Sequence, residues 1–415
     1  MPKRTLLLGA LGALALTTLL GCTGGCEPKP KPTPAVTTGV PHVRVRLLAG
    51  VNRCAIGSDG QAAVTDAVSG RPMSVVVSPG QATDFFFLGD NWQAGNRAAV
   101  GVMLRIEPAD DVTLSVNGQA YRGAVVLVPV GDGKFDVVND VDVERYLQGV
   151  LAKELLPDWH PEAYRAQAVI ARTYALYEAK TNPPGRAWDL NPDERSQVYG
   201  GVRAETPKSN EAVAATRGMV AAYGPPGQER IFKAYFSACC GGTTSSAADV
   251  FNEPAIPPLS AKSNGLTCAI STRFNWPPVT LSKAELTRRF RAWGERTGRP
   301  EAKLPGLRSI EIASLNAYGR PRGFLVTDTR GQQYALTAEQ LRWAINSDPN
   351  GGPTVFSGFF RPIDAGDSIR FADGHGFGHG VGACQWCMQA RALAGLKFPQ
   401  IVMQAYPQAV LVQAY

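Results

Sequence analysis

The chain is poor in histidine, in clustered basic residues and in long apolar segments. Each of these scarcities reduces the number of function classes that the chain can belong to. Only 4 of the 415 residues are histidine. The net charge of +7 is spread along the body of the chain without a Lys/Arg block, which argues against a nucleic-acid partner. Beyond the first 20 residues no segment is long and apolar enough to span a membrane, and no repeat of solenoid length occurs. A length of 415 residues favours two domains rather than one core.

The first 41 residues are typical of export. A basic start is followed by a largely apolar run from Leu6 to Leu20, which predicts a signal peptide over residues 1–21. The run ends in LLGC, which resembles a bacterial lipobox and predicts lipidation of Cys22; an ordinary signal peptide with an incidental cysteine is the alternative. Residues 22–41 are rich in proline and predict a semi-rigid linker. We therefore expect an exported lipoprotein, anchored to a membrane by its N-terminal lipid and facing the periplasm or the cell wall.

The remainder predicts an α+β fold. Residues 42–135 are rich in strand patterns, with a hairpin signal at Asn117-Gly118. Residues 136–415 mix helices and strands, and we expect this second part to enclose a groove and carry the active site. Within it, Asp142 can cap a helix that ends before Pro157, Pro161 suits the first turn of the next helix, and further helices are expected near 282–297 and from about 383.

Glycine occupies every second position from Gly374 to Gly382. Read as a strand, this run would place His375 and His379 on one face and leave the other face bare for a ligand or another backbone. A purely structural bend is the alternative. The run satisfies neither the Gly-x-x-x-x-Gly-Lys-Ser/Thr nor the Gly-x-Gly-x-x-Gly pattern of phosphate loops. With half of the histidines of the chain in this segment, we favour a functional role.

The cysteines fit two kinds of chemistry. His375 and His379, followed by Cys384 and Cys387, have the residue types and spacings of a zinc site. An exported chain meets an oxidising compartment, however, where disulfides are favoured. Disulfide pairing and metal binding both stay open for the same four residues: Cys240, Cys268, Cys384 and Cys387.

Glu154 is the carboxylate best placed for acid catalysis. It lies in the last helical turn before Pro157, where the helix dipole opposes negative charge, and apolar residues flank it. Both effects favour the protonated carboxyl, which is the form that a general acid needs. The alternative is a solvated glutamate that pairs with Lys153 or Arg165.

Four segments, in order, resemble the blocks of the stage II sporulation protein D family, which includes LytB. The first contains YLQGVLAKE followed by EAYRAQAVIARTYA, and the others are SQVYGG, ACCGGTTSSAADVF and GFGHGVGACQW. The last block is the most specific. The chain departs from the family at Phe236 and Ser237, where a histidine is common, and at Cys387, which replaces a small residue.

The resemblance implies a lytic transglycosylase that cleaves the glycan strands of peptidoglycan and leaves a 1,6-anhydro-muramic end. Glu154 matches the essential glutamate of the family, and His379 its recurrent histidine, so both are assigned to catalysis. No cofactor is required for this reaction, and zinc would be an addition at the cysteines. The residues expected to bind substrate are His375, Gly376, Gly378, Gly380, Gln385 and Tyr199.

The LytB branch implies a second possibility. The chain would then be a non-catalytic wall-binding protein that modulates an amidase. The expected partners are accordingly peptidoglycan glycan strands, a membrane reached through the lipid anchor and a wall amidase, and no nucleic acid.

Overall fold

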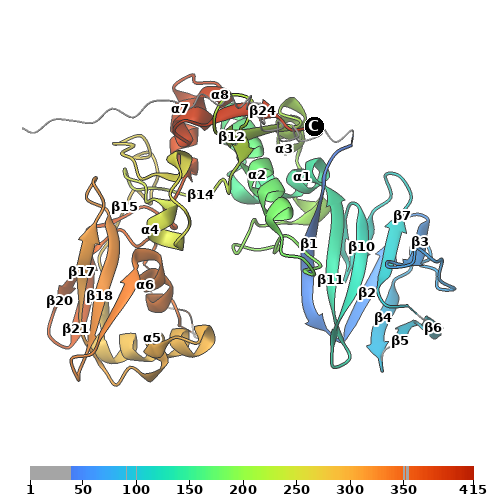
Figure 1. Ribbon diagram of the computed structural model, residues 1–415, viewed down its shortest axis with the longest axis horizontal. Helices are drawn as coiled ribbons and strands as arrows, with labels where there is room; N and C mark the ends of the chain where they lie inside the picture. Colours follow the sequence, from blue (N-terminus) through green and yellow to red (C-terminus); the bar gives the residue numbers. More distant parts are fainter. Residues whose placement is uncertain (1–38, 90, 100, 349–350, 352–354) are drawn as a thin grey trace, which may run out of the picture. The chain divides into compact units, whose positions relative to one another are not determined.

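The computed structural model describes residues 39–415, apart from residues 90, 100, 349–350 and 352–354 (Figure 1). The predicted signal peptide, Cys22 and most of the proline-rich linker lie outside the described residues. The described part belongs to one compact unit and contains both helices and sheets, so the predicted α+β class is confirmed. Among its helices, none combines the length and apolar character needed to cross a membrane.

Strands fill the chain from His42 to Asp142, where two antiparallel sheets bury side chains in a common core. One sheet has the order β1-β11-β10-β7-β3 and the other β6-β5-β4-β2-β8-β9. The predicted hairpin joins β8 to β9, and Asn117 and Gly118 both have positive φ, as its tight turn requires. The strands are β1 His42–Val51, β2 Arg53–Ser58, β3 Ala62–Asp66, β4 Thr83–Leu88, β5 Asn91–Ala94, β6 Arg97–Ala99, β7 Leu104–Pro108, β8 Leu114–Val116, β9 Gln119–Tyr121, β10 Ala124–Gly131 and β11 Lys134–Asp142.

Two helices follow the last strand and share the same core. Helix α1 (Val143–Glu154) begins where β11 ends, and the Asp142 carboxylate accepts a hydrogen bond from the Arg145 amide at 2.9 Å as its N-cap. Helix α2 (Pro161–Thr181) carries proline in its first turn, as predicted, and is buried on nearly all sides. A buried ion pair joins the two helices, because Arg172 donates to Glu144 at 2.7 Å.

The segment after α2 adds short elements to this first core. A three-stranded sheet has the order β13-β12-β24, and β14 pairs with β23 in parallel. The elements are α3 Pro207–Ala215, β12 Met219–Tyr223, β13 Arg230–Ile231, β14 Phe236–Ser237, α4 Ala247–Phe251, β23 Ala383–Cys384, α7 Gln385–Leu393, α8 Phe398–Ala405 and β24 Val410–Gln413, with 3₁₀ turns at Gly201–Ala204 and Pro257–Leu259. A further 3₁₀ turn, Pro300–Lys303, belongs to the stretch of chain that forms a second core.

A second hydrophobic core lies between Trp276 and Phe371 in the sequence. Helices α5 and α6 contact the sheet β17-β18-β19 (Figure 1). The helix predicted near residues 282–297 is confirmed as α5, with Ser282 as its N-cap. The elements are β15 Asn275–Trp276, β16 Val279–Ser282, α5 Lys283–Thr297, β17 Leu307–Leu315, β18 Pro321–Asp328, β19 Gln333–Thr337, α6 Ala338–Ile345, β20 Arg361–Asp364 and β21 Ser368–Ala372.

The alternating glycine run is not the strand that its period suggested. Only Gly374–His375 is extended (β22, paired with β15), and the four glycines from Gly376 to Gly382 all have φ between 71° and 94°. These left-handed conformations are accessible to glycine and strained for other residues. The run is therefore a winding loop that leads into β23 and α7, and the prediction of one histidine-bearing face is wrong.

Candidate active site

Main-chain hydrogen bonds hold the glycine loop against the cysteine-glycine-glycine segment that precedes it by about 140 residues in sequence. Cys239 and Phe377 exchange two bonds, of 3.1 and 2.8 Å, and the Ser245 amide donates to the Gly380 carbonyl at 2.8 Å. Together with the β14–β23 pairing, these bonds bring two of the four family-like blocks into one layer.

Glu154 is the last residue of α1, and its side chain meets two further segments of these blocks. Its Oε1 accepts a hydrogen bond from the Val198 amide at 3.0 Å. The Gln385 side-chain amide, at the start of α7, donates to the Glu154 carbonyl at 3.2 Å and lies 3.5 Å from Oε2. Neither Lys153 nor Arg165 is its partner among the described residues, so the solvated ion pair considered from sequence is not formed.

Burial raises the pKa of the Glu154 carboxyl above its usual value. The bonds from Val198 and Gln385 lower it in part, and the nearby charge of Glu194 raises it further. The net direction is the one predicted from the end of the helix, and desolvation is the main cause. The site therefore holds a carboxyl whose proton is retained to higher pH than that of an exposed glutamate.

His379 lies in an aromatic setting on the glycine loop. Its ring packs edge-on against Tyr235 and Phe251, with centroids 5.8 and 5.2 Å away, and its Nδ1 accepts from the Val381 amide at 2.9 Å. Burial lowers the pKa of His379 to about 4, so the ring is neutral near pH 7. With Nδ1 accepting, the remaining proton sits on Nε2, which makes this nitrogen a hydrogen-bond donor.

His375 has different neighbours, which separates the two histidines. Its ring lies between Phe359 and Phe274, with centroids 4.9 and 6.3 Å away, and burial lowers its pKa. Its Nδ1 is buried without a hydrogen-bond partner among the described atoms. His375 and His379 therefore do not form one ligand pair, which removes them from the zinc pattern proposed on spacing.

The bare sides of the loop glycines face the protein itself. A Cβ on Gly376 would meet the Cys239 carbonyl at 2.6 Å, and one on Gly380 would meet the Arg320 guanidinium at 2.4–2.6 Å. A Cβ on Gly378 would lie 3.0 Å from Ser237. The expectation that these faces receive substrate is thus corrected: the glycines let two segments of chain and one arginine approach closely.

Two further residues expected at the substrate are buried supports. Tyr199 is 5% exposed, and its hydroxyl donates to the Asn139 side chain at 3.0 Å. Gln385 is 6% exposed and is directed at Glu154. Their burial leaves little surface for a sugar, so we assign them to positioning rather than to substrate contact.

Arg320 was not found from the sequence. It is 1% exposed, and its guanidinium donates to the carbonyls of Cys240 and Thr243, both at 2.8 Å, and of His379 at 3.3 Å. The residue comes from the turn before β18, so the second core contributes directly to the loop. Its remoteness in sequence from both segments left no local signal.

The four cysteines named from the sequence converge. The sulfur atoms of Cys240, Cys268, Cys384 and Cys387 all lie within 4.8 Å of one another, and all four residues are buried. Cys239 packs beside them in the same cluster. Their gathering agrees with the sequence-based prediction, and the histidines of the loop are not part of the group.

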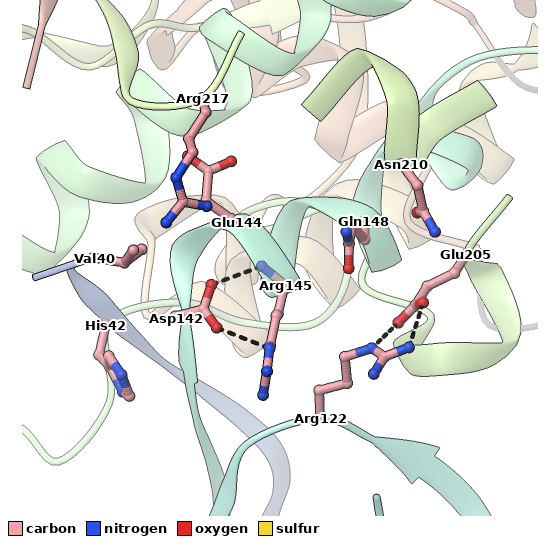
Figure 2. Close-up of a pocket in the computed structure, with 10 residues that line it drawn as sticks. All are labelled: Val40, His42, Arg122, Asp142, Glu144, Arg145, Gln148, Glu205, Asn210 and Arg217. Atoms are coloured by element: carbon pink, nitrogen blue, oxygen red, sulfur yellow. Dashed lines mark hydrogen bonds and ion pairs between the residues drawn. The ribbon is translucent and has the colours of Figure 1, made fainter. Parts of the chain in front are cut away.

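A separate pocket of about 600 Å³ lies at the opposite end of α1 from Glu154 (Figure 2). It is strongly charged, and its paired groups include Arg122 with Glu205 at 2.7 Å and Arg145 with its helix cap Asp142. Glu154 does not line it. The residues that do are Val40, His42, Arg122, Asp142, Glu144, Arg145, Gln148, Glu205, Asn210 and Arg217.

Comparison with known proteins finds a family match and several relatives. A family model described as stage II sporulation protein (SpoIID) matches residues 131–223, which include Glu154 and Tyr199. An uncharacterized protein of Brachyspira hyodysenteriae is 31% identical over 300 residues, which cover 72% of this chain and 74% of that protein. The stage II sporulation protein D of Bacillus subtilis is 26% identical over 308 residues, covering 70% of this chain and 80% of the relative. The chain belongs to the stage II sporulation protein D family.

The amidase enhancer of Bacillus subtilis is another relative. It is 27% identical over 359 residues, which cover 76% of this chain. The match spans only 48% of the amidase enhancer itself, about half of its length.

Proposed function

We propose that the chain is a lytic transglycosylase of peptidoglycan glycan strands, with Glu154 as general acid and then general base. The observation that carries the proposal is the partly exposed Glu154 carboxyl, whose pKa is raised by burial and which is held by hydrogen bonds from Val198 and Gln385. A carboxyl of this kind keeps its proton closer to neutral pH, where it can protonate a leaving group. The family match and the amidase enhancer relative support a function in the cell wall.

The reaction needs one carboxyl and no water. Glu154 gives its proton to the glycosidic oxygen as the bond from that oxygen to the anomeric carbon of muramic acid breaks. The 6-hydroxyl of the same muramic residue then bonds to the anomeric carbon, and its proton passes to the Glu154 carboxylate. The products are a shortened strand and a 1,6-anhydro end, and the enzyme regains its proton. Hydrolytic glycosidases instead place a second carboxylate across the bond.

The hydrogen bonds at Glu154 indicate which oxygen carries the proton. Oε1 accepts from the Val198 amide at 3.0 Å, whereas Oε2 has only the long 3.5 Å approach of Gln385. The proton therefore belongs on Oε2, which we expect to face the glycosidic oxygen. We expect the neutral His379 ring, on the glycine-histidine loop, to orient the sugar near the cleaved bond.

Digestion of purified glycan strands by the full chain tests the proposal. Mass spectrometry should detect anhydro-muramic ends, and Glu154→Gln should abolish them while strand binding and fold are kept, because glutamine is isosteric but cannot donate a carboxyl proton. The matched control is Glu211→Gln, which changes an exposed glutamate of α3 paired with Arg165. If Glu154→Gln released anhydro products at the wild-type rate, the assignment would be wrong.

The amidase enhancer relative supports a second candidate function, modulation of a wall amidase. Adding the Glu154→Gln variant to intact sacculi with such an amidase separates the two functions. Stimulation of the amidase by a variant without anhydro products would assign the chain to modulation.

We also propose that the chain acts outside the cytoplasmic membrane, anchored by a lipid on Cys22. Mass spectrometry of the mature protein from its host should show a diacylated or triacylated N-terminal cysteine. An unmodified mature terminus would overturn the anchor without affecting the reaction.

A further inference from the structure

The geometry points to a zinc site made of the four thiolates of Cys240, Cys268, Cys384 and Cys387. Zinc bound by four cysteines is tetrahedral with Zn–S bonds of about 2.3 Å, which sets the sulfur–sulfur distance at about 3.8 Å. The Cys240 sulfur lies 3.6 Å from that of Cys268 and 3.9 Å from that of Cys387. These distances lie on either side of the tetrahedral value. All four sulfurs lie within 4.8 Å of one another, as one shared ion requires.

Hydrogen-bond donors around the sulfurs suit thiolates. The Cys384 sulfur accepts from the amides of Cys240 and Cys387 at 3.2 and 3.4 Å, and the Cys240 sulfur accepts from the Asn264 side chain at 3.4 Å. Donors of this kind orient metal ligands and stabilise their negative charge. Two disulfides would use the sulfurs in separate pairs and would give these donors uncharged acceptors.

Two positively charged side chains, Arg320 and Lys262, lie beside the cluster. Arg320 is fully buried, and its bonds go to carbonyl oxygens, one of them that of Cys240. Lys262 donates to the Gln404 and Ala405 carbonyls, at the end of α8. Neither side chain forms an ion pair among the described residues. A zinc ion with four thiolates has a net charge of −2, which supplies the missing counter-charge.

The site would tie together three segments that are distant in sequence: the cysteine-glycine-glycine segment, the loop at Cys268 and the first turn of α7. Cys384 is the N-cap of α7, and the next residue, Gln385, donates to Glu154. The zinc is thus structural, with four protein ligands and no open position for a substrate. Its effect on catalysis would be to fix the start of α7, an inference that rests on the proposed function.

The test is the metal and thiol content of the full chain, purified without a metal-affinity step. Elemental analysis should find about one zinc per chain, released when the thiols are blocked by a mercurial reagent. Cobalt(II) in place of zinc should give the absorption of a tetrahedral tetrathiolate. Cys268→Ser and Cys387→Ser should each lose most of the zinc. Cys54→Ser, which changes a buried cysteine in β2 outside the cluster, should retain it.

Three outcomes would overturn the site. Disulfides joining these cysteines, seen as bridged peptides in a digest of the alkylated, unreduced protein, would assign the cluster to redox bridging. Four free thiols without bound metal, after growth and refolding with zinc, would also exclude it. Full zinc content in both ligand variants would place the metal elsewhere. None of these measurements depends on enzymatic activity, so the site and the transglycosylase proposal can fail independently.

Discussion

Replacing Arg320 with methionine should loosen the glycine-histidine loop more than any local feature of the sequence suggests. The guanidinium donates hydrogen bonds to three main-chain carbonyls, those of Cys240 and Thr243 at 2.8 Å and that of His379 at 3.3 Å. An orphaned buried acceptor costs about 1–3 kcal/mol. Because the third bond is long and the segments can relax, we expect a total of about 3–5 kcal/mol rather than the full sum. Lysine keeps the charge but cannot reach all three oxygens from one nitrogen, so Arg320→Lys should lose part of this stability.

Hydrogen exchange followed by mass spectrometry measures this loss where it occurs. Exchange of the Cys239, Ser245 and Phe377 amides, which bond across the loop, should accelerate by about 10²- to 4 × 10³-fold, since each 1.4 kcal/mol is tenfold. Arg322→Met is the matched control, because Arg322 is half-exposed and pairs with Asp249 at the surface. Such a pair contributes about 0–1 kcal/mol. Protection within tenfold of the wild type in Arg320→Met would refute the role given to this arginine.

The groups around Glu154 and His379 give two further predictions. Gln385→Leu removes a hydrogen bond that lowers the Glu154 pKa, so the alkaline limb of the pH–activity profile should move to higher pH. Gln389→Leu, on the same helix, should leave that limb in place. An unchanged profile in Gln385→Leu would argue against the role of Gln385 in positioning the Glu154 carboxyl. His379 stays neutral in the fold down to about pH 4, whereas an unfolded histidine takes up a proton near its ordinary pKa of 6.5. Its contribution to stability is therefore present above pH 6.5 and is lost as pH falls through about 4. In His379→Gln, the free energy of unfolding in urea should depend less on pH over that range. The same pH dependence in the variant as in the wild type would contradict a neutral His379 ring in the fold.

Local signals predicted much of the fold. The caps and prolines that bound α1 and α2, the Asn117-Gly118 hairpin and the start of α5 at Ser282 all depend on neighbouring residues, and the structure has them. The second core could not be found in this way. Its strands and helices contact elements that are distant in sequence, as β16 does with β21. The apolar pattern of each element predicts its type but not which other element it will contact.

The candidate site likewise combines features that the local sequence predicted with features that it did not. The direction of the Glu154 pKa shift was predicted from its place at the end of α1, although its main cause is burial against segments that are remote in sequence. Two of the four gathered cysteines, Cys240 and Cys384, lie in the family-like blocks, whereas Cys268 comes from a loop outside them. The glycine run misled because alternation fits both a strand and a chain of left-handed glycines, and only the positive φ values distinguish them. The Val198 amide has no side-chain signal of its own, although it lies in the block that carries Tyr199. Tyr199 itself belongs to the core.

The glycine loop therefore serves two neighbours at once. Its backbone is hydrogen-bonded to the cysteine-glycine-glycine segment, and its His379 carbonyl accepts a hydrogen bond from Arg320. Beyond its end, Cys384 belongs to the thiol cluster, and the next residue, Gln385, donates a hydrogen bond to Glu154. A disturbance of the cluster can reach the carboxyl through that single bond, because Cys384 also caps the helix that presents Gln385. The close packing around the loop explains its four left-handed glycines. No side chain could be accommodated where two backbones and a buried guanidinium meet at such short distances.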